Sequence, residues 1–304
     1  MTPLSPTDSR SLLSANLICL ASMMIWAAGL PAANLIVPHM PPVALTAARA
    51  TLAALVLLPI WWAAEGRSSL IRANWLVGAW VGFVSLGLAS VFVIIALALT
   101  DAVTVGIVTA TMPIAGIALE SIADKRPLTR AVVLGLVLSV AGGLIALYGS
   151  PVALDLGLGA TAALASVLCY TWGSRETVRA LPGMTALGRS AVTVAGAALI
   201  MLVAAMADGM VRGSWPNWSA IDLHAFGGLL VFGIGSMAIS QALWIMSVGR
   251  IGIGAASLHM NAVPFYIMLI VYLFGGPWNW WQTAGAAVVV LGALIAQGLI
   301  RVPR

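Results

Sequence analysis

The chain has 304 residues, of which 62% are hydrophobic and only 8% are charged. A soluble core of this size does not accommodate so much apolar surface, so the composition predicts an all-α integral membrane protein. The formal net charge is +5, but the basic residues follow the loops of a membrane protein, and we expect no nucleic-acid partner.

Ten segments of the chain are long and apolar enough to span a bilayer. A spanning helix takes about 20 apolar residues, and the gaps between charged residues leave room for spans at 12–31, 43–63, 75–98, 102–121, 129–148, 156–176, 184–207, 222–247, 250–273 and 279–300. Residues 1–10 are rich in proline and hydroxyl side chains, and they are expected to form a disordered cytoplasmic tail.

Basic residues outside the spans set the predicted orientation. If the amino terminus is cytoplasmic, all of them except Arg212 fall on the cytoplasmic side. The positive-inside rule therefore places both termini in the cytoplasm. Tryptophans near the span ends are expected to be interfacial anchors, namely Trp61, Trp62, Trp75, Trp278, Trp280 and Trp281.

One sequence pattern of the first half recurs in the second half. Residues 102–148 contain an apolar helix with Pro113, a short hinge and a second helix with spaced glycines, and residues 253–297 repeat this plan around Pro264. The glycines Gly135, Gly142, Gly285 and Gly292 keep the spacing to their proline within one residue. An internal repeat in a membrane chain points to a transporter with its site at the repeat interface.

The repeat predicts two five-helix units, at 11–150 and 151–304, with ten transmembrane helices in total. A unit with an odd number of spans enters the membrane from the opposite face when it is copied, so the two repeats are inverted. Pro113 and Pro264 interrupt corresponding helices, where they free backbone carbonyls in mid-membrane, and we interpret both as structural hinges.

Polar and aromatic residues inside the spans are the candidates for substrate binding. Serine and threonine are also ordinary packing residues in membrane helices, and a proline often only bends its helix, so each signal is weak alone. The candidates are Trp26, Thr109, Thr111, Tyr170, Trp172, Ser240, Gln241, Trp244, Ser257, His259 and Asn261. On an α-helical wheel Ser257 and His259 lie on different faces, and His259 is the first that we would remove.

Two arginines, Arg49 and Arg189, lie inside spans. A buried charge in a membrane helix marks a functional site by default, whereas the alternative is a long stem that reaches the interface. The two arginines lie near opposite surfaces, as equivalent residues of inverted repeats do.

The spans lack the groups that other chemistries need. No Asp or Glu lies at the middle of a span, so His259 is the only buried group expected to titrate near neutrality. An intramembrane protease needs a serine with a facing histidine or two buried aspartates. The spans hold no such aspartates, and a serine partner for His259 lacks a supporting carboxylate. We expect no enzyme, no cofactor and no metal site, and Cys19 and Cys169 lie inside apolar spans where a disulfide is not expected.

These residues resemble the drug/metabolite transporter superfamily, in particular its permeases built from two EamA-type units of five helices. The resemblance rests on the ordered pairs Trp26 with Trp172, Arg49 with Arg189 and Pro113 with Pro264, together with the glycine pairs. Many members carry a Gly-Glu pair after the fourth and ninth helices, but this chain has Asp124-Lys125 and Gly275-Gly276 there. A role for that glutamate is not carried over, and the buried glutamate of the small multidrug members is missing as well.

Within the superfamily the chain looks most similar to bacterial exporters of the aromatic amino-acid exporter (YddG) type. This resemblance implies a bacterial inner-membrane protein that exports amino acids of broad range, including aromatic or other neutral ones, and related metabolites. We expect transport by alternating access. Because the spans hold no buried carboxylate that could couple transport to protons, we expect facilitated efflux. Its partners are then a small-molecule substrate and the lipid bilayer, and a monomer is plausible. The alternatives are an exporter of drugs or organic cations, and less favoured an intramembrane protease or a scaffold.

Overall fold

The computed structural model describes residues 6–99, 105, 108–146 and 157–300. Within these ranges every regular element is a helix. The first half contains α1 (Pro6–Asn34), α2 (Pro42–Glu65), α3 (Arg67–Arg72), α4 (Trp75–Gly82), η1 (Phe83–Leu88), α5 (Ala89–Leu99), α7 (Met112–Ala123) and α8 (Arg130–Ala146). The second half contains α9 (Leu158–Arg179), α10 (Ala186–Arg212), η2 (Trp218–Ala220), α11 (Leu223–Leu230), η3 (Val231–Ile239), α12 (Ser240–Ile251), α13 (Ile253–Ser257), η4 (Leu258–Ala262), α14 (Val263–Leu273) and α15 (Trp280–Ala296).

The elements follow the predicted spans closely. In the part of the chain that the structure describes, five continuous helical stretches are long and apolar enough to cross a membrane, and shorter apolar helices accompany them. The five are Ser11–Ala33, Pro42–Glu65, Trp75–Ala96, Ala186–Arg212 and Leu223–Ile251. The chain is therefore an all-helical, multi-pass membrane protein. One boundary differs: α1 begins at Pro6, so residues 6–10 are helical where a disordered tail was expected, and residues 1–5 lie outside the described part.

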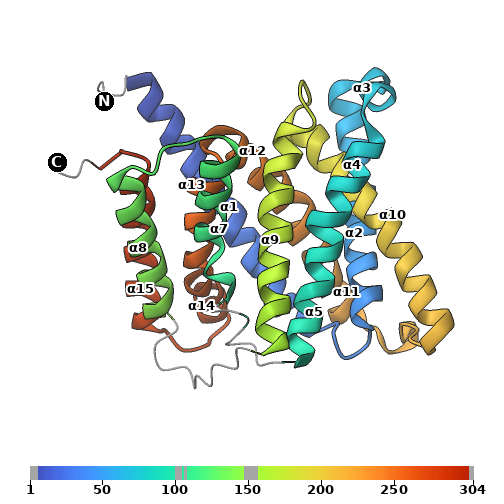
Figure 1. The fold of residues 1–304 in the computed structure, drawn as a ribbon. Coiled ribbons are helices and arrows are strands. Elements are labelled where there is room, and N and C mark those ends of the chain that lie inside the picture. The colour runs from blue at the N-terminus through green and yellow to red at the C-terminus, as the bar shows by residue number, and fades with distance from the viewer. Residues whose placement is uncertain (1–5, 100–104, 106–107, 147–156, 301–304) are drawn as a thin grey trace.

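The contacts between the two halves are largely symmetric: most contacts between a helix of the first half and a helix of the second half have a counterpart in which the two halves trade roles. In each half the first helix contacts the third helix of the other half: α1 contacts η3 and α12, and α9 contacts η1 and α5. Equivalent helices also contact each other directly, as α2 does with α10, α7 with α13 and α8 with α15. Figure 1 shows α8 and α15 together at one edge of the bundle and α10 at the other. Two copies of one unit produce this pattern when they associate in opposite orientations.

Glycines bring α8 and α15 into close contact. A methyl group added at Gly142 would lie 2.5 Å from the carbonyl oxygen of Gly285. Small residues allow membrane helices to approach backbone to backbone, because lipid supplies no hydrophobic force between them. The glycines that mark the sequence repeat are therefore the residues at which its two copies meet.

The fourth and ninth predicted spans are interrupted helices. A turn at Ala110 and Thr111 precedes α7, and the 3₁₀ segment η4 separates α13 from α14. Pro113 and Pro264 each occupy the second position of the α-helix that follows the break. Proline is well tolerated there, since its missing N–H is one that the first turn leaves unpaired anyway.

Trp61 differs from the expected interfacial anchor. It is only 1% exposed, and its ring lies 6.1 Å from that of Trp75. The absence of a side chain at Gly188 on α10 leaves room for the Trp61 indole. Trp61 is therefore a packing residue between α2 and α10, whereas Trp62 and Trp280 remain exposed.

Candidate substrate site

Aromatic and amide side chains meet where α9 packs against α12. The Tyr170 and Trp244 rings are stacked, with centroids 6.1 Å apart and planes inclined by 24°. The Tyr170 hydroxyl donates to Gln241 Oε1 at 3.3 Å, and the Trp244 indole N–H donates to Ser174 Oγ at 2.9 Å. Three predicted site residues from distant parts of the chain thus form one group, which we call the central cluster together with Ser174.

Arg49 lies on α2 beside this cluster. Its guanidinium carbon is 4.0 Å from the centroid of the Phe232 ring, and Tyr170 lies within electrostatic range of its charge. The Arg49 Nε atom is buried without an acceptor, and all ion pairs of the described residues involve other side chains. A cation–π contact offsets part of the desolvation of a guanidinium but leaves its N–H donors free. Arg49 is therefore a partly buried cation whose Nε lies buried without an acceptor among the described residues.

Trp26 and three serines lie at the contact between α1 and the eighth span. Ser22 Oγ donates to the Ser240 carbonyl at 2.8 Å, and Ser236 Oγ donates to the Trp26 carbonyl at 3.2 Å. Trp26 packs partly buried against the core that includes Trp244, and Trp172 is half-buried on α9. Ser240 therefore joins α1 to α12 and is held by a neighbouring helix.

His259 lies in a second polar group, away from the central cluster. Its Nε2 is 2.7 Å from Asn16 Oδ1, and the Asn16 amide also pairs with the side chain of Gln297. The Asn16 amide nitrogen donates to the Leu12 carbonyl at 2.8 Å, which fixes the orientation of that amide. His259 Nε2 must then be the donor, and Nδ1 keeps a lone pair that is buried without a partner. This geometry fits a neutral imidazole, because a proton on Nδ1 has no acceptor.

Asn261 contacts the fifth span. Its amide nitrogen donates to both the carbonyl and the hydroxyl of Ser139 at 3.1 Å, while Ser139 Oγ donates to the Leu258 carbonyl. These bonds tie the interrupted helix to α8. In the structure Asn261 is thus a residue of the helix–helix contact.

Three hydroxyl candidates are satisfied by their own helices. Thr109 Oγ1 donates to the Val105 carbonyl at 2.8 Å, and Thr111 Oγ1 donates to the Val108 carbonyl at 2.6 Å. Ser257 donates to the Gly254 carbonyl and packs against Gly116 of α7. These residues line the interrupted helices without joining the central cluster.

Arg189 begins α10 at the opposite end of the bundle from Arg49. Its Nε donates to the Leu181 carbonyl at 3.0 Å, so the side chain closes the turn before its own helix. The two arginines of the sequence pattern therefore differ in this structure: Arg189 has a backbone acceptor, and Arg49 has none.

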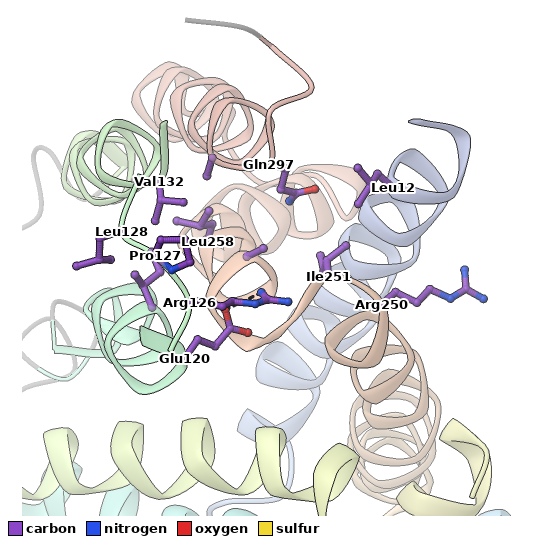
Figure 2. Close-up of a pocket in the computed structure, with 14 residues that line it drawn as sticks. Leu12, Glu120, Arg126, Pro127, Leu128, Val132, Arg250, Ile251, Leu258 and Gln297 are labelled. Carbon is purple, nitrogen blue, oxygen red and sulfur yellow. Dashed lines mark hydrogen bonds and ion pairs between the residues drawn. The ribbon is translucent and has the colours of Figure 1, made fainter. Parts of the chain in front are cut away.

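A pocket of about 270 Å³ opens on the face that carries the start of α1 and the end of α15, which we call the terminal face. Figure 2 shows it between the end of α7, the loop before α8, the turn between α12 and α13, and the ends of α1 and α15. Its polar lining consists of Glu120, Arg126, Arg250 and Gln297. Sequence reasoning missed these residues, because charges at span ends were interpreted only as a sign of orientation.

Glu120 and Arg126 form an ion pair in this pocket. Arg126 Nη1 donates to Glu120 Oε2 at 2.9 Å, and the Glu120 side chain is 11% exposed against 56% for Arg126. Gly252 has a φ of +84°, and a methyl group there would lie 2.2 Å from Glu120 Oε1. The positive φ favours glycine in this turn, and the missing side chain leaves room for the ion pair in its present position. The sequence signal for this turn was Gly252, which follows Arg250 at the start of the ninth predicted span.

A second ion pair holds the end of α7 to α9. Arg175 donates from Nε to Asp124 Oδ2 at 2.7 Å and from Nη2 to Oδ1. These hydrogen bonds, together with the charges of Arg175, Arg179 and Arg126, hold the pKa of Asp124 below its ordinary value. Asp124 stands at one of the positions where the resemblance led us to look for glutamate, and its role is to clamp two helices.

The structure is that of a helical membrane protein whose two halves pack against each other, with interrupted helices and buried polar groups between them. Residues 13–148 match the model of the EamA-like transporter family. This part of the chain is therefore similar to the EamA-like transporter family.

Two further proteins are similar to the chain. The uncharacterized transporter YyaM of Bacillus subtilis (strain 168) is 31% identical over 86 residues, which is 28% of this chain and 28% of that protein. A solved crystal structure superimposes with a TM-score of 0.79 at 22% identity, covering 95% of this chain and 98% of the other. At that identity the structural likeness establishes the fold alone.

Proposed function

We propose that this protein is a bacterial inner-membrane transporter that exports amino acids and related metabolites by alternating access. Two units, at residues 11–150 and 151–304, enclose the path, and the terminal face is cytoplasmic. The observation that carries the proposal is the partly buried Arg49 guanidinium, whose Nε has no acceptor among the described residues and whose charge lies near the stacked rings of Tyr170 and Trp244.

A substrate carboxylate fits these free donors. Arginine binds carboxylates through two parallel hydrogen bonds, and such charge-assisted bonds are stronger than neutral ones. The Gln241 amide oxygen and the Tyr170 hydroxyl supply acceptors for an ammonium group, and the ring faces suit an apolar or aromatic side chain. The set of groups therefore matches a neutral amino acid.

An exporter of drugs or organic cations is the alternative. A cationic substrate needs a carboxylate or an electron-rich cage, and the central cluster adds a positive charge from Arg49 instead. Among the described residues the carboxylates lie at helix ends and loops, as Glu120 and Asp124 do. Electrostatic repulsion from Arg49 thus disfavours a cation in this place.

Counterflow in proteoliposomes tests the proposal. Vesicles loaded with an unlabelled amino acid should accumulate the labelled one, and a panel should include neutral aliphatic and aromatic amino acids alongside quaternary ammonium cations. Accumulation of amino acids but not of cations is the expected result. Accumulation of cations alone would replace the proposal with its alternative.

A further inference from the structure

The terminal-face pocket carries charge that the central cluster does not use. Arg126 and Arg250 contribute two formal positive charges and Glu120 one formal negative charge, so basic groups outnumber acidic ones in the pocket. Opposite charges at the mouth of a transport path select ligands by attraction and repulsion. The pocket therefore favours a ligand with at least one anionic group.

The Glu120–Arg126 pair leaves donors and an acceptor free for a ligand. One N–H of Arg126 Nη1 is used on Glu120 Oε2, whereas no hydrogen bond of the described residues involves Arg126 Nε or Nη2 as a donor or Glu120 Oε1 as an acceptor. Gly252 keeps the turn beside Oε1 free of a side chain. In Figure 2 the Arg126 side chain extends across the pocket above Glu120, while the Arg250 side chain points away over α1.

The size and the apolar wall of the pocket limit the ligand further. Leu12, Ile251 and Leu258 line the pocket beside the charged pair. Its volume of about 270 Å³ lies just under the range of roughly 300–1,000 Å³ that is typical for drug-sized ligands. One small molecule with an apolar part therefore fits better than a bulky drug.

We infer that the terminal-face pocket is a loading site for zwitterionic α-amino acids, in which Arg126 binds the carboxylate and Glu120 Oε1 accepts from the ammonium group. This inference rests on the proposed function for the identity of its ligand. It adds a second binding site, separated from Arg49, at the entrance through which the substrate enters. Recognition of both charges at the entrance explains how simple amines are rejected before they reach the central cluster.

Protection of an engineered cysteine tests the site directly. Leu128 lines the pocket and is 60% exposed, so Leu128→Cys in a background with Cys19→Ala and Cys169→Ala should react with a maleimide in the purified full-length protein. L-Phenylalanine should protect this cysteine, phenylalaninamide should not, and 3-phenylpropionate should protect weakly. Ile71→Cys on α3, outside the pocket and 69% exposed, is the matched control and should show no protection.

Two variants assign the roles. Arg126→Gln should raise the concentration of phenylalanine needed for protection by about 10-fold or more, since a charge-assisted bond is worth roughly 1.5–3 kcal/mol. Glu120→Gln should weaken protection by phenylalanine but not by 3-phenylpropionate. Arg72→Gln, on the exposed end of α3, is the control for the loss of a positive charge. Equal protection by the amide, or no effect of Arg126→Gln, would overturn the inference.

Transport of phenylalanine into proteoliposomes separates this inference from the proposed function. Protection without transport supports the pocket and contradicts the exporter. Transport without protection contradicts the pocket and leaves the exporter standing. Arg49→Gln should reduce transport by about 10- to 100-fold while protection of Leu128→Cys is retained, because Arg49 lies outside the pocket.

Discussion

Gly135 on α8 and Gly292 on α15 lie backbone against backbone. A methyl group built on Gly135 would lie 2.5 Å from the Gly292 carbonyl oxygen, and one built on Gly292 would lie 2.7 Å from the Gly135 carbonyl oxygen. The same two residues mark corresponding positions of the sequence repeat. The contact between the repeats is therefore reciprocal, and it excludes side chains from both partners.

Gly292→Ala should destabilise the protein through this contact. The added methyl group meets a backbone oxygen that cannot move aside, and overpacking of this kind typically costs about 1–3 kcal/mol. Thermal unfolding in detergent measures the loss. Gly227→Ala on α11 is the control, because nothing lies within 4 Å of its added methyl group. Equal melting temperatures for the two variants would contradict the predicted role of the glycine pair.

Arg49→Gln should reduce amino-acid counterflow by about 10- to 100-fold, which is the loss of one charge-assisted hydrogen bond at roughly 1.5–3 kcal/mol. Arg49→Lys should recover only part of the rate, since an ammonium keeps the charge but not the paired donors. Arg212→Gln, whose side chain is 76% exposed beside Asp208, is the control and should transport normally. Full activity of Arg49→Gln in a folded protein would remove Arg49 from the substrate site.

Transport should not depend on a pH gradient. His259 is held in one neutral tautomer by Asn16, and its Nδ1 has no acceptor that would stabilise a second proton. His259→Gln should therefore preserve counterflow, provided that its amide donates to Asn16 as the imidazole does. The measurement is counterflow with and without an imposed pH gradient. Strict dependence on the gradient, lost in His259→Gln, is the result that would make His259 a proton carrier.

The Asp124–Arg175 ion pair should make stability depend on pH in the acidic range. Because the pKa of Asp124 is lowered in the folded state, the stabilisation is fully present above the unfolded value of about 3.9 and is lost as the pH falls through the folded value. Asp124→Asn should thus melt at a lower temperature than the wild type at neutral pH. The difference should shrink under acidic conditions. Asp208→Asn, at the far end of α10, is the control, and a constant gap across the pH range would contradict the assignment.

The spans could be predicted from the sequence because hydrocarbon thickness fixes the length of an apolar helix. The repeat could be predicted too, because Gly135, Gly142, Gly285 and Gly292 leave their spacing visible wherever their helices meet. The 5 long apolar helices and the interrupted ones follow the predicted order. These features depend on local pattern alone.

The grouping of polar side chains could not be predicted in the same way. An α-helical wheel puts Ser257 and Asn261 on one face, but η4 turns by about 120° per residue rather than 100°. Ser257 consequently faces Gly116 on α7, whereas Asn261 faces Ser139 on α8. A local change of helix type was invisible in the residue pattern, and so the candidates separated into different groups.

The pocket residues were missed for another reason. Glu120 and Arg126 are brought together by the turn that follows α7, where the Arg126 N–H bonds to the Glu120 carbonyl, and the Gly252 turn from the other half of the chain passes beside them. Span-end charges carry an orientation signal that hides any binding role, and nothing in the spacing of Glu120 and Gly252 indicates that they touch. The contact between Glu120 and Gly252 depends on how the two halves of the chain pack against each other.

The two π-helical segments, η1 and η3, occupy the third helix of each half. Ala89 N–H bonds to the Val84 carbonyl and Ser240 N–H to the Gly235 carbonyl, five residues back instead of four. Each segment meets a glycine of the other half, with Ser85 against Gly173 and Ser236 against Gly29. A π-helical turn is rare and locally interrupts the regular α-helical hydrogen bonding, and such turns are frequent at functional sites. Each half thus contains a π-helical turn in its third helix, packed against a glycine in the first helix of the other half, so both irregular turns lie where the two halves meet.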